Sequence, residues 1–293
     1  MQESRLYSRL LGAPEKLCDL GIVCLRLAWL SFVNRFLRGR VTQKDGPVVS
    51  LTTYGERINT VYFTIESIGR GRVLPSRLVL WLDDRAAYER PPASLRRLVN
   101  RGLEIKLCKN YGPHTKYYPY VESETAFKVP LITADDDVVY PTFWLSGLME
   151  EFHRSPDLVH CYLAKVVALT DDGVAKYADW EFSQSTEPSV HRVAHGVFGA
   201  LYPLSLLRAL KEAGDEFARC CPKADDLWLH VNALRHGCKV KQIHPKPYRF
   251  PAIPGTQEAG LWIENQSVGG NDRAVKATYT QRDIEILRAA CGQ

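Results

Sequence analysis

The strongest constraint on the fold is an alternation of strand-like and helix-like segments that begins at Pro47. Apolar residues recur at the spacing of a helix face in residues 57–68, and a short helical segment at residues 94–102 is closed by Gly102. Short apolar runs between and beside these segments predict strands at residues 47–54, 76–84, 103–108 and 129–133. This alternation predicts an α/β fold in which helices flank both faces of a mostly parallel, twisted sheet.

The second half of the chain is less regular. Residues 171–189 are polar and loop-like, and residues 246–278 predict a loop of the length that functional lids have. We therefore expect a first half at about residues 47–157 and a second half at about residues 158–293. Further predicted elements are a helix at 141–155, one or two strands at 157–169, helices at 202–213 and 224–237, a strand at 238–243 and a helix at 280–290.

The composition is that of a globular protein, with 293 residues, 45% hydrophobic and 24% charged. This length allows one large or two modest domains, with a core that needs no disulfide or metal to fold. The net charge of +5 is too small to indicate nucleic acid, whereas an anionic sugar nucleotide or a membrane surface suits it equally. None of the eight cysteines has CxxC spacing, which predicts reduced thiols in a cytoplasmic protein.

Residues 1–46 differ from the rest of the chain and are expected to form a separate N-terminal helical segment. Apolar side chains crowd residues 17–37, but the uninterrupted apolar stretch is well short of the about 20 residues that a spanning helix needs. No signal-peptide cleavage site follows it. Two interpretations stay open. The helix lies peripherally on the inner face of the cell membrane, with Arg38 and Arg40 as its basic flank, or it packs on the protein's own core or on a partner subunit.

Three consecutive carboxylates, Asp135, Asp136 and Asp137, follow the predicted strand at residues 129–133. At the tip of a buried strand they repel one another unless a cation lies between them. Hard divalent ions such as Mg²⁺ take carboxylate oxygens together with substrate phosphates, and open α/β sheets bind ligands at this edge. The triplet therefore indicates a metal that holds a phosphorylated substrate. The alternative is that the aspartates cap the helix that starts near Thr142.

A second acidic pair, Asp225 and Asp226, opens the predicted helix at residues 224–237. Carboxylates at a helix start meet the helix dipole favourably, so a capping role is open here as well. Against it, Trp228 and Cys221 surround the pair with apolar bulk. Such surroundings raise the pKa of a carboxyl group and favour a role as general base.

The order of the segments is strand, helix, strand ending in Asp, strand, acidic triplet, and then a helix opened by the acidic pair. This order resembles that of the metal-dependent GT-A glycosyltransferases, and among them the family 2-like enzymes of bacterial capsule and lipopolysaccharide loci. The resemblance covers roughly residues 47–275. The triplet with the Val-Val-Tyr-Pro that follows is similar to the family's Asp-x-Asp region, and residues 224–240 are similar to its Glu-Asp segment. Residues 50–58 and 78–84 resemble its first two nucleotide-binding strands, residues 195–203 its glycine-rich acceptor segment and residues 265–273 the C-terminal loop of the capsule-locus subgroup.

The resemblance implies a GT-A fold, with a Rossmann-like nucleotide-binding half and an acceptor half. It implies transfer of a sugar from a nucleotide-sugar, by base rate a UDP-sugar, to a hydroxyl of a saccharide or glycolipid, with inversion. Mn²⁺ or Mg²⁺ at the aspartate triplet neutralises the charge of the leaving diphosphate as a Lewis acid. Asp226 takes the place of the family's catalytic base, and Asp225 that of the glutamate beside it.

The sequence departs from the family in two places. Ala134 stands where the family commonly has an aspartate, which leaves open which two residues of the triplet touch the metal. The Gln-x-x-Arg-Trp box of processive polysaccharide synthases is absent, which favours a single addition.

Further residues are expected around the donor. Thr52, Thr53, Tyr54 and Arg57 follow the first strand and are expected to line the base and ribose together with Asp83. Lys116 either meets a phosphate as a point charge or is a solvated lysine. His244 is a candidate third metal ligand, and His195 is expected near the acceptor. Each has a structural alternative, such as strand-end capping for Asp83 and Asp84, or an ordinary structural role for a lone histidine. Tyr117, Tyr118, Tyr120 and Trp262 either stack on sugar rings or belong to the core.

Two other classes of protein remain as alternatives. A catalytically inactive protein that binds carbohydrate or nucleotide-sugar on the same fold is disfavoured by the intact Asp225–Asp226 pair. A sugar nucleotidyltransferase would need a glycine-rich phosphate loop with a basic residue near its start, which residues 50–58 lack. An NAD-binding domain is excluded because no GxGxxG motif follows the first strand.

Overall fold

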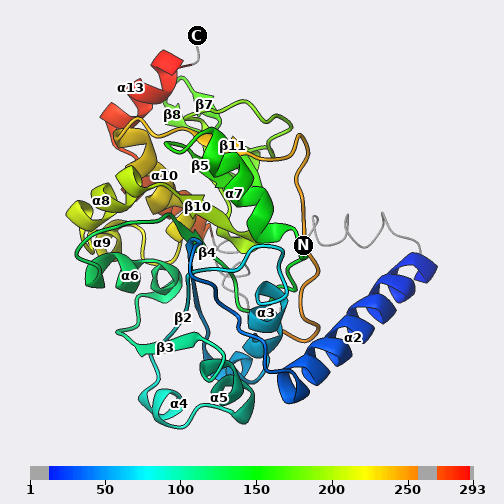
Figure 1. The fold of residues 1–293 in the computed structure, drawn as a ribbon. Coiled ribbons are helices and arrows are strands. Elements are labelled where there is room, and N and C mark those ends of the chain that lie inside the picture. Colours follow the sequence, from blue (N-terminus) through cyan, green and yellow to red (C-terminus); the bar gives the residue numbers. More distant parts are fainter. Residues whose placement is uncertain (1–12, 257–268, 291–293) are drawn as a thin grey trace.

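The computed structural model describes residues 13–256 and 269–290, with side chains from Leu20 onward. A seven-stranded sheet forms the centre of the molecule (Figure 1). In sheet order its strands are β11 (Val240–Gln242), β5 (Val159–Cys161), β10 (Ala200–Tyr202), β4 (Leu131–Thr133), β1 (Val48–Thr52), β2 (Arg77–Leu82) and β3 (Leu103–Leu107). Only β10 runs antiparallel to its neighbours in this sheet, so the sheet is mixed but mostly parallel.

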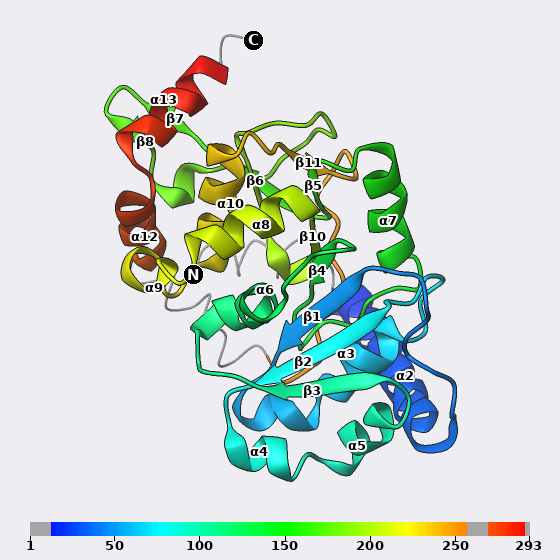
Figure 2. The same ribbon diagram turned by 60° about the vertical axis from the view of Figure 1, so that its left-hand side comes forward.

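The four strands predicted in the first half are all present, and their side chains alternate between two cores, as the period of a strand requires. Val49 and Leu51 of β1 pack into one core, and Val48 packs into the other. The first core is covered by α3 (Val61–Ile68), α5 (Ala93–Val99) and α7 (Trp144–Arg154). The second is covered by α6 (Tyr118–Ser123), α8 (Leu204–Ala213) and α10 (Asp225–Arg235), so helices flank both faces of the sheet (Figure 2).

Smaller elements complete the second half. Two short sheets pair β6 (Ala164–Val166) with β9 (Arg192–Ala194), and β7 (Leu169–Thr170) with β8 (Gly173–Val174). The remaining helices are α4 (Arg85–Glu89), α9 (Phe217–Cys220), α12 (Gly270–Thr278) and α13 (Gln281–Ala290), and the 3-10 turns are η1 (Gly55–Asn59), η2 (Gly112–Lys116), η3 (Tyr177–Asp179) and η4 (Gly196–Phe198).

Two predictions of local structure were wrong, and one strand had not been predicted. Residues 55–59 form the turn η1, which Gly55 enters in the left-handed region (φ 55°), so α3 begins only at Val61. The glycine-rich segment at 195–203 contains strand β10. There, a Cβ on Gly199 would lie 2.5 Å from the Trp144 indole nitrogen, so a glycine is required. Residues 270–278, predicted as loop, form α12.

The N-terminal helix α2 (Ala13–Phe36) packs against α3 and α5 (Figure 1). One side of its last turns, with Leu30, Val33 and Asn34, is buried, and Asn34 joins an ionic network there. The Asn34 amide donates to Glu66 (2.9 Å), whose carboxylate pairs with Arg101 (2.5 Å). Earlier in the helix, Arg26 donates to the Tyr140 carbonyl (2.7 Å). This end of α2 thus packs on the protein's own core, one of the two interpretations of the segment.

Other side chains of α2 are exposed. Five large apolar residues, spaced alternately three and four positions apart, form a stripe along it that we call the α2 stripe: Ile22, Leu25, Trp29, Phe32 and Phe36 are 47–74% exposed. Within the part of the chain that the structure describes, no helix has both the length and the apolar character to span a membrane.

The sheet topology places the loops after β1 and β4 side by side. The chain leaves β1 towards β2 on one side, whereas β4 lies parallel to β1 on its other side. At such a switch in strand order the loops at the carboxyl ends diverge and leave a crevice, the usual ligand site of open α/β sheets. Thr52 and Thr53 reach this crevice from β1, and Asp135, Asp136 and Asp137 reach it from β4.

Candidate active site

A cavity of about 770 Å³ opens at this switch point, within the size range of small-ligand sites. Both halves of the chain line it. The wall contains His195 and, except for His244, all residues predicted to bind the nucleotide-sugar or the metal or to act in catalysis: Thr52, Thr53, Tyr54, Arg57, Asp83, Lys116, Asp135, Asp136, Asp137, Asp225 and Asp226. The two acidic groups, 88 positions apart in sequence (225 − 137), therefore face one cavity.

Asp136 and Asp137 are each only 5% exposed, whereas Asp135 is half-buried. Asp136 Oδ2 accepts from the Thr53 hydroxyl (2.6 Å), and Asp136 Oδ1 pairs with Arg57 (3.0 Å). Burial raises the pKa of Asp136 although both partners oppose it. Because both of its oxygens are bound, Asp136 mainly connects the loop after β4 to Thr53 and Arg57 in the loop after β1.

Arg57 also pairs with Asp137 (3.2 Å) and donates to the Thr256 carbonyl (2.5 Å). Burial, and then repulsion by Asp135 and Asp136, raises the pKa of Asp137 to about 7. The segment that contains Thr256 runs along the triplet, since the Ile253 amide donates to the Asp137 carbonyl (2.7 Å). Part of the predicted C-terminal loop therefore closes the edge of the site.

Lys116 lies between the two acidic groups. Its Nζ is 2.5 Å from Asp135 Oδ1 and 3.8 Å from Asp225 Oδ2. Burial alone would lower the pKa of Lys116, but attraction by Asp135, Asp225 and Asp226 overrides it and holds that pKa well above its usual value. The Ser50 hydroxyl of β1 fixes this turn by donating to the Lys116 carbonyl (2.6 Å). Lys116 is therefore a half-buried, charged ammonium and not a solvated surface lysine.

The triplet offers the oxygen donors that a hard divalent cation prefers. Among residues 13–256 and 269–290, however, no group of three or more His, Cys, Asp or Glu side chains converges as a metal site. Asp136 is the least available of the three because Thr53 and Arg57 use both its oxygens. The chemistry of the donor set thus fits a divalent ion best at Asp135 and Asp137, the two positions of an Asp-x-Asp motif.

Asp226 lies in the first turn of α10, where neither it nor Asp225 caps the helix through its side chain. Its Oδ1 accepts from the Gly196 amide (2.9 Å). A Cβ on Gly196 would lie 3.3 Å from that oxygen, so the glycine leaves room for this close approach. Burial, and then the neighbouring charge of Asp225, raises the pKa of Asp226 to about 8, although Lys116 opposes the shift. A carboxyl group in this range is suited to accept a proton near neutral pH.

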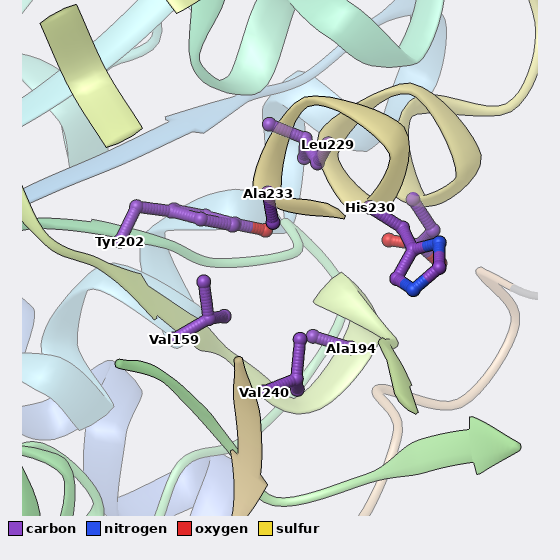
Figure 3. Close-up of a pocket in the computed structure, with 8 residues that line it drawn as sticks. Val159, Ala194, Tyr202, Leu229, His230, Ala233 and Val240 are labelled. Atoms are coloured by element: carbon purple, nitrogen blue, oxygen red, sulfur yellow. The ribbon is translucent and has the colours of Figure 1, made fainter. Parts of the chain in front are cut away.

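A small cavity of about 10 Å³ borders Asp226 (Figure 3). It has room for at most one water molecule. Its wall, to which Asp226 also contributes, is mostly apolar, and Figure 3 shows the Tyr202 ring reaching across it towards Ala233 of α10. The remaining lining residues are Val159, Ala194, Leu229, His230 and Val240.

His195 lies beside the second oxygen of Asp226. Its Nδ1 is 3.5 Å from Asp226 Oδ2, and its Nε2 is 3.2 Å from the Tyr177 hydroxyl. Burial, and then the positive charges of Lys165, Arg249 and Lys116, lowers the pKa of His195 to about 3. His195 is therefore neutral at physiological pH.

The second half of the chain also contributes cavity residues that were not predicted from the sequence. Lys165 lies over the rings of Tyr177 (4.4 Å) and Phe182 (5.4 Å), and the Arg249 guanidinium lies over Phe182 (5.0 Å). No motif marks these positions, because they come from separate segments that only the tertiary fold brings together. Asn271 of α12 reaches the cavity from the segment matched to the capsule-locus loop.

Other predicted residues have structural roles. Asp84 caps α4 through bonds from the Ala86 and Ala87 amides (2.8 and 3.2 Å), whereas Asp83 lines the cavity and accepts from Asn110 (2.5 Å). His244 is not among the cavity-lining residues, and its ring lies 5.6 Å from that of Tyr162. Tyr117, Tyr118 and Tyr120 are buried in the core, and Trp262 lies outside the described residues.

No protein-family model and no curated protein matches this sequence. Among solved structures, a mannosyltransferase from Pyrobaculum calidifontis, in complex with GDP-Man and Mn²⁺, aligns with a TM-score of 0.50 and 15% identity. The alignment covers 90% of this chain and 76% of that one. The similarity confirms the predicted fold class, an α/β fold of the GT-A type with an added N-terminal helix.

Two other solved structures align less closely. Residues 1–349 of S. aureus TarS give a TM-score of 0.46 at 12% identity, over 83% of this chain and 69% of that one. CMP:2-keto-3-deoxy-manno-octonic acid synthetase complexed with CTP gives 0.43 at 12% identity, over 78% of this chain and 100% of that one. At these identities the comparisons concern the fold alone.

Proposed function

We propose that the protein is an inverting, metal-dependent glycosyltransferase, with residues 47–293 as its catalytic domain. It transfers a sugar from a nucleotide-sugar, with a UDP-sugar as first candidate, to a hydroxyl of a saccharide or glycolipid of the capsule or lipopolysaccharide type. The observation that carries the proposal is the shared cavity. Asp226, with its pKa of about 8, faces the cavity from the acceptor half, and the triplet faces it from the donor half. The GDP-Man and Mn²⁺ of the mannosyltransferase complex agree with this assignment.

In the proposed reaction the acceptor oxygen attacks the anomeric carbon while the bond to the diphosphate breaks. The electron pair of that bond leaves with the diphosphate oxygen, and the acceptor proton moves to the Asp226 carboxylate. One displacement of this kind inverts the anomeric centre. Thr52, Thr53, Tyr54 and Asp83 surround the nucleoside, and Lys116 and Arg57 add positive charge beside the diphosphate.

A divalent ion held by Asp135 and Asp137 supplies further positive charge to the leaving diphosphate when it is bound. We expect Mn²⁺ titrated into the protein with UDP to bind as measured by calorimetry, and Asp135→Asn and Asp137→Asn to abolish the binding signal. Asp136→Asn should keep the signal but lower the melting temperature, because Asp136 holds Thr53 and Arg57. Equal loss of binding in all three variants would contradict this division of roles.

The test of the function is release of free nucleotide from a panel of UDP-, GDP- and CMP-sugars with Mn²⁺, with and without saccharide acceptors. Asp226→Asn should retain donor binding and a normal melting temperature but lose transfer by a factor of about 10² to 10⁴, the range of general-base catalysis. Asp172→Asn, at an exposed position, is the matched control. Near-normal transfer by Asp226→Asn would remove Asp226 from the mechanism, and pyrophosphate release from a nucleoside triphosphate would indicate a nucleotidyltransferase instead.

We further propose that the protein contacts a membrane surface through the α2 stripe. From Leu20 to Arg40 the chain carries four arginines and no acidic residue. An exposed stripe with Trp and Phe, beside positive charge only, suits the interface of an anionic bilayer.

A further inference from the structure

We infer that His195 and Tyr177 form a hydrogen-bonded chain that positions the Asp226 carboxylate, a role that rests on the proposed function of Asp226 as base. Two consecutive residues, His195 and Gly196, lie against the two carboxylate oxygens of Asp226. The Gly196 amide donates to Oδ1 (2.9 Å), and the His195 ring faces Oδ2 (3.5 Å). The backbone at His195 is fixed, because its amide donates to the Leu163 carbonyl (2.8 Å).

The hydrogen-bond directions follow from the donors and acceptors available. An ionised carboxylate only accepts, so a neutral His195 must carry its single proton on Nδ1 to interact with Asp226. Its Nε2 is then an acceptor, and the Tyr177 hydroxyl at 3.2 Å is the donor. One tautomer therefore satisfies the whole chain when Asp226 is in its reactive, ionised form. The 3.5 Å separation is long for such a bond, as is common in ligand-free sites that tighten with substrate.

Tyr177 is held from a distant part of the sequence. Its backbone amide donates to Asp272 Oδ1 in the first turn of α12 (2.8 Å), and its ring lies under the Lys165 ammonium (4.4 Å). Both contacts fix the direction of the phenol. The segment that includes Asp272, matched to the capsule-locus loop, thus supports the base through Tyr177 and without touching Asp226.

Charged groups from several elements face His195 and Asp226 and shift the pKa of each. Around His195 they are Lys116 of η2, Lys165 of β6 and Arg249, which all disfavour imidazolium. Around Asp226 they are Asp225 and Asp135, which raise its pKa, and Lys116, which lowers it. Loss of the His195 donor therefore removes one interaction that favours ionised Asp226, so the Asp226 pKa should rise.

The decisive variant is Tyr177→Phe, which removes one hydroxyl and leaves His195 in place. We expect kcat to fall about tenfold, a usual effect of losing a supporting hydrogen bond, with both KM values unchanged. The acid limb of the rate profile should move to higher pH. His195→Ala should show a larger effect, and His195→Asn, which retains a donor near the Nδ1 position, should recover part of it. Tyr88→Phe, at an exposed tyrosine of α4, is the matched control.

An unmoved pH limb with wild-type kcat in Tyr177→Phe overturns the inference. So does a raised KM for the acceptor at constant kcat, because the pair would then contact the acceptor and not act through Asp226.

A spectroscopic measurement keeps the inference separable from the proposed function. Long-range ¹H–¹⁵N spectra at about pH 9, where Asp226 is ionised, should show His195 as the Nδ1–H tautomer in the wild type. Tyr177→Phe should reduce that population. The Nε2–H tautomer in the wild type would overturn the inference even if a donor is turned over. The expected tautomer without turnover of any sugar donor would instead count against the proposed function alone.

Discussion

At the scale of single residues, Lys116 is the charge on which the site depends most. Its ammonium lies between Asp135 and Asp225, and it also lowers the pKa of Asp226. Removing one partner of a buried ionic group leaves the other charges uncompensated, which is more costly than losing a surface pair. The sequence indicated a lysine beside a phosphate. It did not indicate that two acidic groups share this lysine, because the three segments meet only in the folded chain.

We therefore expect Lys116→Gln to lower the free energy of unfolding by about 1–3 kcal/mol, between the scale of an exposed ion pair and that of a buried one, because Lys116 and Asp135 are half-buried. Urea denaturation at pH 7.5 measures this, with Lys128→Gln, at an exposed position, as the control. The variant should also shift the acid limb of activity to higher pH, because Lys116 no longer favours ionised Asp226. Stability within the error of the control variant would show that Lys116 does not neutralise the acidic cluster.

At the scale of elements, the apolar patterns predicted the strands of the donor half and the helices α5, α7, α8, α10 and α13 well, because burial on a sheet or helix face leaves a periodic trace. The apolar patterns did not predict the elements whose formation depends on tertiary contacts. Strand β10 depends on Gly199 passing under Trp144, and α12 lies in a region whose prolines and glycines indicate loop. The cavity wall could be predicted from strand ends and acidic motifs, but Lys165, Phe182 and Arg249 could not.

The helix α2 connects its exposed stripe to the site. On its inner side Arg26 donates to the Tyr140 carbonyl, and the Tyr140 hydroxyl accepts from the Asp135 amide (3.0 Å). The Asn34–Glu66–Arg101 network anchors its last turns on α3 and α5. An interaction on the outer side of α2 would therefore be made by an element that is firmly attached to the donor half.

We expect the protein to sediment with vesicles that contain anionic phosphatidylglycerol, and to be released by salt. The double variant Trp29→Gln/Phe32→Gln should bind more than tenfold more weakly, since burying each such side chain contributes about 1.5–3 kcal/mol. Val99→Gln, at an exposed apolar residue outside α2, is the control and should bind normally. A wild-type protein that stays in the supernatant, or that forms a dimer which the double variant loses, would show that lipid does not cover the stripe.

At the scale of the whole molecule, two buried histidines join the elements that carry the site. His114 precedes Lys116 in η2, and its Nε2 lies 2.7 Å from the Cys221 carbonyl, just before α10. His230 lies within α10, 2.6 Å from the Tyr279 hydroxyl and 2.8 Å from the Val190 carbonyl. Burial is the main cause that lowers the pKa of each to about 4. The contacts that hold α10 against η2 and against Tyr279, between α12 and α13, are thus made partly by imidazoles that the fold keeps neutral.

Because these two histidines are neutral in the folded protein, their contribution to the free energy of unfolding depends on pH. Between about pH 6.5 and pH 4 the unfolded chain binds protons at these histidines and the folded chain does not, so their contribution to stability falls as the pH is lowered. For His230 the loss approaches ~3 kcal/mol at pH 4. Asp137 and Asp226, whose raised pKa values favour the folded state at low pH, act in the opposite direction, so the total change is smaller.

Comparison with His230→Gln isolates the histidine term. The amide side chain keeps a donor and an acceptor but does not titrate, so the stability advantage of the wild type over this variant should shrink steadily from pH 7.5 to pH 4. Urea unfolding at intervals of half a pH unit measures the difference, and His153→Gln, at an exposed position, should show none. If the advantage of the wild type stayed constant across this range, His230 would not be held neutral by the fold.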